Sequence, residues 1–271
     1  MSVSFLQGQQ RKGPSLLVWS LLALTAVFGL WQYYVSTQLI SSYDKTYFYQ
    51  LLLPTLLMAI LCGALLAQSG AVVQTSLGNA FASPSTVGIS AGALLGAMVI
   101  NLVMDDPSIW QVWLSAFTFA LVIALLILLL SQVIGGGKLQ LILIGMAMSL
   151  AVGALSSAIM IYAEQRMDGL FLWGSGNIGQ SDSELVSIIL LPALLLLLLP
   201  ILCHRQLDML SLGEDTASVV GLSVNRWRAV LLMIAVLQAS LVTAMVGVLG
   251  FIGLMAPHMA RLVGFNKTRQ Q

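Results

Sequence analysis

The feature that most constrains this chain is a run from Thr46 to Met104 that contains no Asp, Glu, Lys or Arg. Further stretches without these residues cover 13–43, 107–137, 139–163, 185–204 and 229–258. A helix needs about 20 apolar residues to cross the hydrocarbon core of a bilayer. The chain is therefore expected to be an all-α protein that crosses a membrane several times.

Composition supports this class and excludes others. Charged residues make up 8% of the 271 residues, and the mean hydropathy is +0.97. Soluble domains usually carry about 25% charge, so a soluble enzyme, a secreted disulfide scaffold and a disordered chain are excluded. With 11 Lys and Arg against 10 Asp and Glu, no nucleic-acid partner is expected. Cys62 and Cys203 lie in apolar runs, without metal-ligand spacing, and no cofactor or metal is predicted.

The uncharged stretches predict seven spans. The turn-rich residues 78–85 divide the longest stretch in two. The tail from Gly250 to Gly264 contains Pro257 and is expected to form a short or re-entrant helix. The predicted spans are 15–35, 50–70, 86–104, 110–133, 139–163, 185–203 and 229–249.

Basic residues set the expected orientation. With residues 1–14 in the cytoplasm, the inner segments hold six basic residues and the outer segments hold two before the tail: Arg11, Lys12, Lys138, Arg205, Arg226 and Arg228 inside, Lys45 and Arg166 outside. This bias follows the positive-inside rule. Residues 15–271 are then one transmembrane domain with an inner loop at 204–228. The basic tail from Arg261 to Arg269 falls on the outer side, against the trend.

The chain offers little for catalysis or ion coupling. Gly135–Lys138 resembles a phosphate loop, but Gln132 and Leu139 stand where that motif needs Gly and Ser or Thr, so a short turn is expected. No charged residue lies in the middle of a predicted span, which disfavours a proton-driven carrier. His204 and His258 are isolated. The chain is predicted not to be an enzyme, and the energy for transport is expected to come from elsewhere.

Small residues form two stripes at helical spacing. One holds Gly88, Gly92 and Gly96, and the other Gly145, Ser149 and Gly153. Such spacing lets helices approach closely, and it also suits a polar path. Candidate path residues are Ser90, Gly92, Ser149 and Gly153.

The inner segment 204–222 is unusually apolar for a short loop. Its pattern predicts two short helices broken at Gly221, with Ser211 and Glu214 forming a capping box. A solvated loop is the simpler interpretation. However, four apolar residues suit docking into a groove of a partner: Leu212, Ala217, Val219 and Val220.

This segment resembles the cytoplasmic coupling loop of the FecCD-type (BtuC-like) permeases, the membrane subunits of ABC importers for ferric siderophores, haem and cobalamin. Residues 69–74 with 78–93, 173–176 and 250–261 resemble further motifs of that family. The resemblance covers about residues 15 to 269. It singles out as signature residues Gly70, Asn79, Pro84, Gly88, Gly253, Pro257, His258 and Arg261.

The resemblance implies a ten-helix fold with inverted repeats, of which about seven or eight helices are present here. The second repeat, from about residue 185, then looks incomplete, because the family continues for about two more spans. Family members also carry Arg-x-Pro-Arg at the outer start of span two. Here the segment is Leu52-Leu53-Pro54-Thr55, so both arginines that pair with the binding protein in the family are missing, and Lys45, the nearest basic residue, would compensate only in part.

The function implied is that of the permease subunit of an ATP-driven importer in a bacterial inner membrane, moving ferric siderophores. Its implied partners are ABC ATPase subunits, a periplasmic or lipid-anchored binding protein and a second permease chain, within membrane lipid. Leu212, Gly213, Glu214, Ala217 and Gly221 would couple to the ATPase, and Trp173, Gly174 and Ser175 would face the binding protein. Alternatives are a self-contained secondary transporter or channel, and a truncated, non-transporting remnant.

Overall fold

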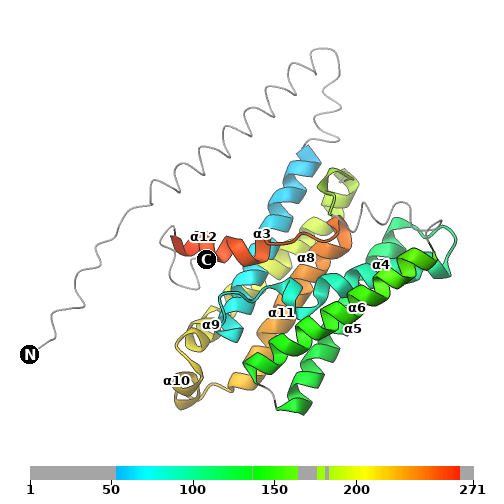
Figure 1. The fold of residues 1–271 in the computed structure, drawn as a ribbon. Coiled ribbons are helices and arrows are strands. Elements are labelled where there is room, and N and C mark those ends of the chain that lie inside the picture. Colours follow the sequence, from blue (N-terminus) through cyan, green and yellow to red (C-terminus); the bar gives the residue numbers. More distant parts are fainter. Residues whose placement is uncertain (1–52, 136, 164–175, 181–182, 263–271) are drawn as a thin grey trace, which may run out of the picture.

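The computed structural model describes residues 53–135, 137–163, 176–180 and 183–262, and all regular structure in these residues is helical. Long helices alternate with short helical pieces along the chain (Figure 1). In order, these are α3 (Leu53–Leu77), η2 (Pro84–Val87), α4 (Ile89–Val103), α5 (Ile109–Ile134), α6 (Lys138–Tyr162), η4 (Ile178–Gln180), α8 (Ser183–Leu202), α9 (His204–Ser211), α10 (Glu214–Val219), α11 (Val224–Val246) and α12 (Ile252–Leu262).

Helices α3 and α11 form the centre of the bundle. They pack against each other, and both also contact α8 (Figure 1). Most of their residues are buried, whereas α6 and α8 expose most of theirs. The exposed side chains of these outer helices are mainly leucines, as expected for surfaces that face lipid.

Five helices are long and apolar enough to cross a membrane: α3, α5, α6, α8 and α11, with the last four close to the predicted spans. Helix α4 is apolar but has only 15 residues. The prediction of a short helix in the tail is confirmed by α12. The predicted span 15–35 lies outside the described residues.

The predicted end of the second span is wrong. The second span is predicted to end at residue 70, but α3 continues to Leu77. Ser69, Gly70 and Gln74 are all buried inside the helix. In the sequence, these polar or small residues look like the end of an apolar helix. In the structure, neighbouring helices supply their hydrogen-bond partners or pack against them: Ser69 Oγ, for example, donates to the Ala235 carbonyl of α11 at 2.8 Å.

The first glycine stripe is a packing surface. A Cβ at Gly92 would lie 3.0 Å from the Cα of Ala120 in α5. One turn further along α4, Ser115 Oγ donates to the Gly96 carbonyl at 2.7 Å. The two helices therefore meet backbone to backbone, as small residues at this spacing allow.

A buried glutamine compensates for a proline in α8. Pro200 has no N–H to donate to the carbonyl of Leu196, four residues earlier in the helix. Gln238 of α11 donates Nε2 to that carbonyl at 3.0 Å and to Gln68 Oε1 of α3 at 2.6 Å. The Gln238 side chain is fully buried. One amide thus links the three central helices where α8 has lost an internal bond.

Replacing Gln238 by Leu should therefore destabilise the bundle by about 1–3 kcal/mol, because it removes the donor from the Leu196 carbonyl and from the half-buried Gln68 amide oxygen. The measurement is the free energy of unfolding in mixed detergent–SDS micelles. Thr118→Val is the matched control, since Thr118 Oγ1 bonds only within α5, to Leu114, on an exposed face. Equal stability of the two variants would contradict this role of Gln238.

Candidate functional site

Two segments that are distant in the sequence meet at a contact between α3 and α12. Pro257 lacks the N–H that would bond the carbonyl of Gly253 within α12, so this carbonyl is free to face α3. It lies against Gly70, so closely that a Cβ on Gly70 would overlap it. Three predicted signature residues therefore form one backbone contact, which we call the α3–α12 joint.

Gln74 fastens this joint one turn further along α3. Its Nε2 donates to the Leu254 carbonyl at 3.1 Å, and its Oε1 accepts a hydrogen bond from the Arg261 guanidinium. The side chain is buried. The Gln74 amide thus bonds to both ends of α12: to Leu254 in its first turn and to Arg261 in its last turn.

The connection after α3 closes over the same joint. Asn79 donates its N–H to the Gln74 carbonyl at 3.1 Å, and its Oδ1 accepts from the Phe81 N–H at 2.9 Å. Pro84 then packs on Gly253, where an added Cβ would lie 3.0 Å from Pro84 Cδ. Phe81 also contacts the His258 ring, with 6.2 Å between ring centroids. The motif blocks at 69–85 and 250–261 therefore form one structural unit.

A second cluster lies at the end of the bundle that carries α9 and α10, where α5 ends and α6 and α11 begin (Figure 1). Glu214, the first residue of α10, pairs with Lys138 Nζ at 3.0 Å and with the Arg228 guanidinium. Arg228 is buried, and Glu214 is partly exposed. We call these three residues the inner ion bridge; it ties α10 to the starts of α6 and α11.

The electrostatics of the bridge favour the charged carboxylate. The hydrogen bond from Lys138, supported by the charge of Arg228, holds the pKa of the Glu214 carboxyl below its ordinary value, against a partial opposing effect of burial. A lowered carboxyl pKa stabilises the folded chain at pH values above the pKa of the unfolded state. This contribution is complete at neutral pH and is lost only as the pH falls through the lowered value.

The inner segment is helical, but not as predicted. The break between its two short helices is at Gly213, with φ +105°, and Gly221, with φ +89°, instead ends the second helix. The predicted capping box is wrong, because Ser211 ends α9 and its Oγ donates to the Asp208 carbonyl. Helix α11 begins at Val224, so the loop predicted at 204–228 is shorter and both Arg226 and Arg228 are helical.

Three of the four predicted apolar docking residues are on the surface. Leu212, Val219 and Val220 are 70%, 86% and 64% exposed. Ala217 is 1% exposed. Its predicted place on the docking surface is wrong, because it lies on the buried face of α10. The segment thus presents exposed apolar side chains on a scaffold that the inner ion bridge holds in place.

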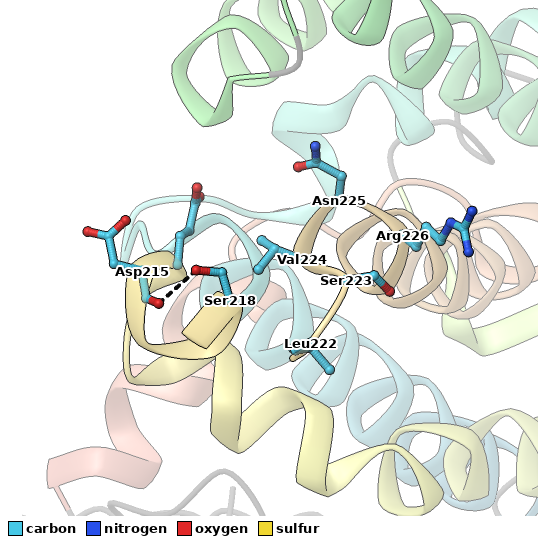
Figure 2. A pocket seen from close by; sticks show the side chains of 8 residues that line it. Asp215, Ser218, Leu222, Ser223, Val224, Asn225 and Arg226 are labelled. Carbon is cyan, nitrogen blue, oxygen red and sulfur yellow. Dashed lines mark hydrogen bonds between the residues drawn. The ribbon is translucent and has the colours of Figure 1, made fainter. Parts of the chain in front are cut away.

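A groove of about 460 Å³ runs beside α10, between it and the start of α11. Figure 2 shows Asp215 and Ser218 on one wall and Arg226 on the other side, directed away from Asp215. Ser218 Oγ donates to the Asp215 carbonyl at 2.8 Å. The groove therefore has an acidic wall that continues into the exposed apolar side chains of α10.

The four candidate path residues do not behave alike. Gly92 is in the α4–α5 contact. The signature residue Gly88, one turn earlier, packs against Ile123 and Ile127 of the same helix α5. Ser149 Oγ donates to the Gly145 carbonyl in its own helix. Gly153 has no atom within 4 Å of an added Cβ, so it faces open space, and Ser90 is half-buried. Trp173, Gly174 and Ser175 lie outside the described residues.

Sequence reasoning did not identify four residues as functional: Gln74, Lys138, Arg228 and Gln238. Gln74, Lys138 and Gln238 make polar contacts between elements that are distant in the sequence, and Arg228 bonds to Glu214 of the preceding helix. The available signal was their position, since a glutamine within an apolar run must find a partner inside the bundle. Lys138 directly follows a glycine turn and Arg228 lies in the second turn of a helix, where both can reach the same loop.

The fold is that of an α-helical, multi-pass membrane protein. A model of the FecCD transport family matches residues 15–271. The chain is 36% identical over 219 residues to the Fe(3+)-citrate import system permease protein YfmE of Bacillus subtilis, a match that covers 80% of this chain and 65% of YfmE. It is 35% identical over 239 residues to the vitamin B12 import system permease protein BtuC of Vibrio vulnificus, covering 85% and 70%.

A solved structure agrees with this fold. It is described as an inward-facing conformation of a provisionally assigned metal-chelate type ABC transporter, and it matches with a TM-score of 0.76 at 26% identity. The match covers 91% of this chain and 83% of the other. The chain belongs to the FecCD transport family.

The α3–α12 joint predicts a sharp difference between two glycines of α3. Gly70→Ala should destabilise the chain by about 3 kcal/mol, because the new methyl group would meet backbone that has no room to yield. Gly63→Ala should stabilise the same helix by up to ~1 kcal/mol, since an added Cβ meets nothing within 4 Å there. The readout is the free energy of unfolding in mixed micelles, and equal stability of the two variants would refute the joint.

Proposed function

We propose that the chain is the permease subunit of an ATP-binding-cassette importer, and that α9 and α10 form the surface that docks the ATPase. The observation that carries this proposal is the set of exposed apolar side chains on α10 and beside it: Leu212, Val219 and Val220. An apolar surface at the aqueous end of a membrane bundle suits a protein partner. The inner ion bridge gives that surface a fixed geometry.

The bridge also suits transmission of movement. A partner that displaces α10 acts on Glu214, and through it on Lys138 at the start of α6 and on Arg228 in α11. Helix α6 carries the candidate path residues Ser149 and Gly153. Two packings of these helices, with ATP binding at the partner favouring one of them, would alternate access to the path.

The substrate class follows from the relatives. The names of YfmE and BtuC specify ferric citrate and vitamin B12, which are both metal ions held in organic chelates. We propose that this chain transports a metal chelate, with ferric siderophores as the first class to test. A binding protein would deliver the chelate, and a second permease chain would complete the path. The location is then the inner membrane of a bacterium, with the basic end of the bundle in the cytoplasm.

A self-contained transporter is the second candidate. It would need no docking surface at α10, and would leave three exposed apolar side chains without a use. Glu214→Arg does not separate the two candidates, because it would place a third cation beside Lys138 and Arg228 and disturb the segment itself. A change at an exposed apolar residue is the cleaner test.

The test is co-purification with an ABC ATPase subunit of a ferric-chelate importer, co-expressed with the chain. Val219→Asp should reduce the ATPase retained by at least about tenfold, because a charge at a buried interface position costs more than ~1.4 kcal/mol. Val103→Asp is the matched control, since Val103 is an equally exposed valine at the end of α4.

Retention that falls equally in both variants, or in neither, would contradict the docking surface. Transport of a ferric chelate by the purified chain without any ATPase would favour the self-contained transporter.

A further inference from the structure

We propose that a cavity between α5, α6 and α11 binds the phosphate of an anionic phospholipid headgroup. The cavity has a volume of about 700 Å³, and it is separate from the groove beside α10 except that Asn225 and Arg226 border both. This inference goes beyond the proposed import function, because it concerns a ligand that is not transported.

The polar part of the cavity is cationic. Its lining includes Arg226 and Arg228, and it includes no Asp or Glu. Gln132 and Ser131 of α5 and Asn225 of α11 add neutral hydrogen-bonding groups. Arginine presents several N–H donors in a planar fork that matches phosphate oxygens. Glu214 pairs with Arg228 from the α10 side.

The two arginines at this cavity differ in exposure and in partners. Arg228 is 6% exposed, and its buried Nε has no hydrogen-bond partner within the described chain. A buried charged donor without a partner is costly, so a ligand acceptor that reached this atom after a movement of the Arg228 side chain would stabilise it. Arg226 makes no ion pair with another described residue, and Figure 2 shows it directed away from Asp215.

The position of the cavity favours a lipid over a soluble anion. It lies at the level where α5 ends at Ile134 and α11 begins at Val224, the level at which headgroups meet a spanning helix. Its apolar wall extends to Leu128 and Leu232, about 9 Å and about 12 Å further into the bundle from these helix ends at 1.5 Å per residue. This depth suits the glycerol and first acyl carbons below a phosphate.

The surfaces around the cavity are also apolar. Val230 on its rim is 46% exposed, and Leu129 and Val133 on the neighbouring face of α5 are 57% and 84% exposed. Acyl chains can therefore continue along α5 and α11 from a headgroup held by the arginines. Basic pockets between spanning helices at the cytoplasmic surface are a general form of anionic lipid recognition.

The test measures lipid binding to the delipidated, detergent-solubilised chain by native mass spectrometry, with phosphatidylglycerol and phosphatidylcholine as probes. Phosphatidylglycerol should bind more tightly than phosphatidylcholine. Arg226→Gln should weaken phosphatidylglycerol binding about fivefold, the effect of one basic residue near an anionic lipid. Arg205→Gln is the matched control: Arg205 is an exposed cation of α9 that does not line the cavity.

Arg228→Lys gives a second test that keeps the positive charge beside Glu214. It should also weaken phosphatidylglycerol binding, because a lysine ammonium lacks the planar fork of N–H donors that matches phosphate oxygens. Unfolding of each variant without lipid serves as the check on folding.

Several outcomes would overturn the proposal. Equal losses in Arg226→Gln and Arg205→Gln would show attraction to the whole basic end rather than a site. Equal binding of phosphatidylcholine would show that the negative charge of the headgroup is not recognised. Displacement of the lipid by millimolar inorganic phosphate would assign the cavity to a soluble anion. Unchanged lipid binding with loss of ATPase retention in Arg226→Gln would assign the arginine to the protein interface.

Discussion

The contact between the Gly253 carbonyl and Gly70 is the constraint on which the rest of this structure depends. It exists because Pro257 removes the internal partner of that carbonyl and because Gly70 has no side chain to keep it away. Gln74 fastens the same crossing through Leu254 and Arg261. Helix α3, fixed in this way against α12, also packs on α11 and α8, so the joint sets the position of the central helices.

The end of the bundle that carries α9 and α10 is built differently from the α3–α12 joint. There the chain keeps a short helical segment with exposed apolar residues, and holds it by charges as well as by the burial of Leu207, Leu210 and Ala217. Glu214 reaches two different spanning helices through Lys138 and Arg228. Ion pairs of this kind, partly exposed, add modest stability. Under the proposed function, they would pass a displacement of α10 to α6 and α11. The bundle thus combines a rigid crossing with a linked surface segment.

The sequence predicted the class, most spans and the family motifs, because uncharged runs report directly on the bilayer. The sequence misplaced the end of the second span, because Ser69, Gly70 and Gln74 are unfavourable residues within an isolated apolar helix. Their hydrogen-bond and packing partners lie more than 160 residues away. It placed the break of the inner segment at Gly221 and included Ala217 in the docking surface, because local patterns do not reveal which of two glycines turns the chain or which face is buried. The bond from Gln238 to Leu196 was beyond any local pattern.

The most direct test of the central joint is a double-mutant cycle between Gln74 and Arg261, with both changed to Ala singly and together. The measured quantity is the free energy of unfolding in mixed detergent–SDS micelles. A charged hydrogen bond between the buried Gln74 and the half-buried Arg261 predicts a coupling energy of about 1.5–3 kcal/mol. Additive effects, within about 0.3 kcal/mol, would contradict the account, since α12 would then not be fastened to α3 through Gln74.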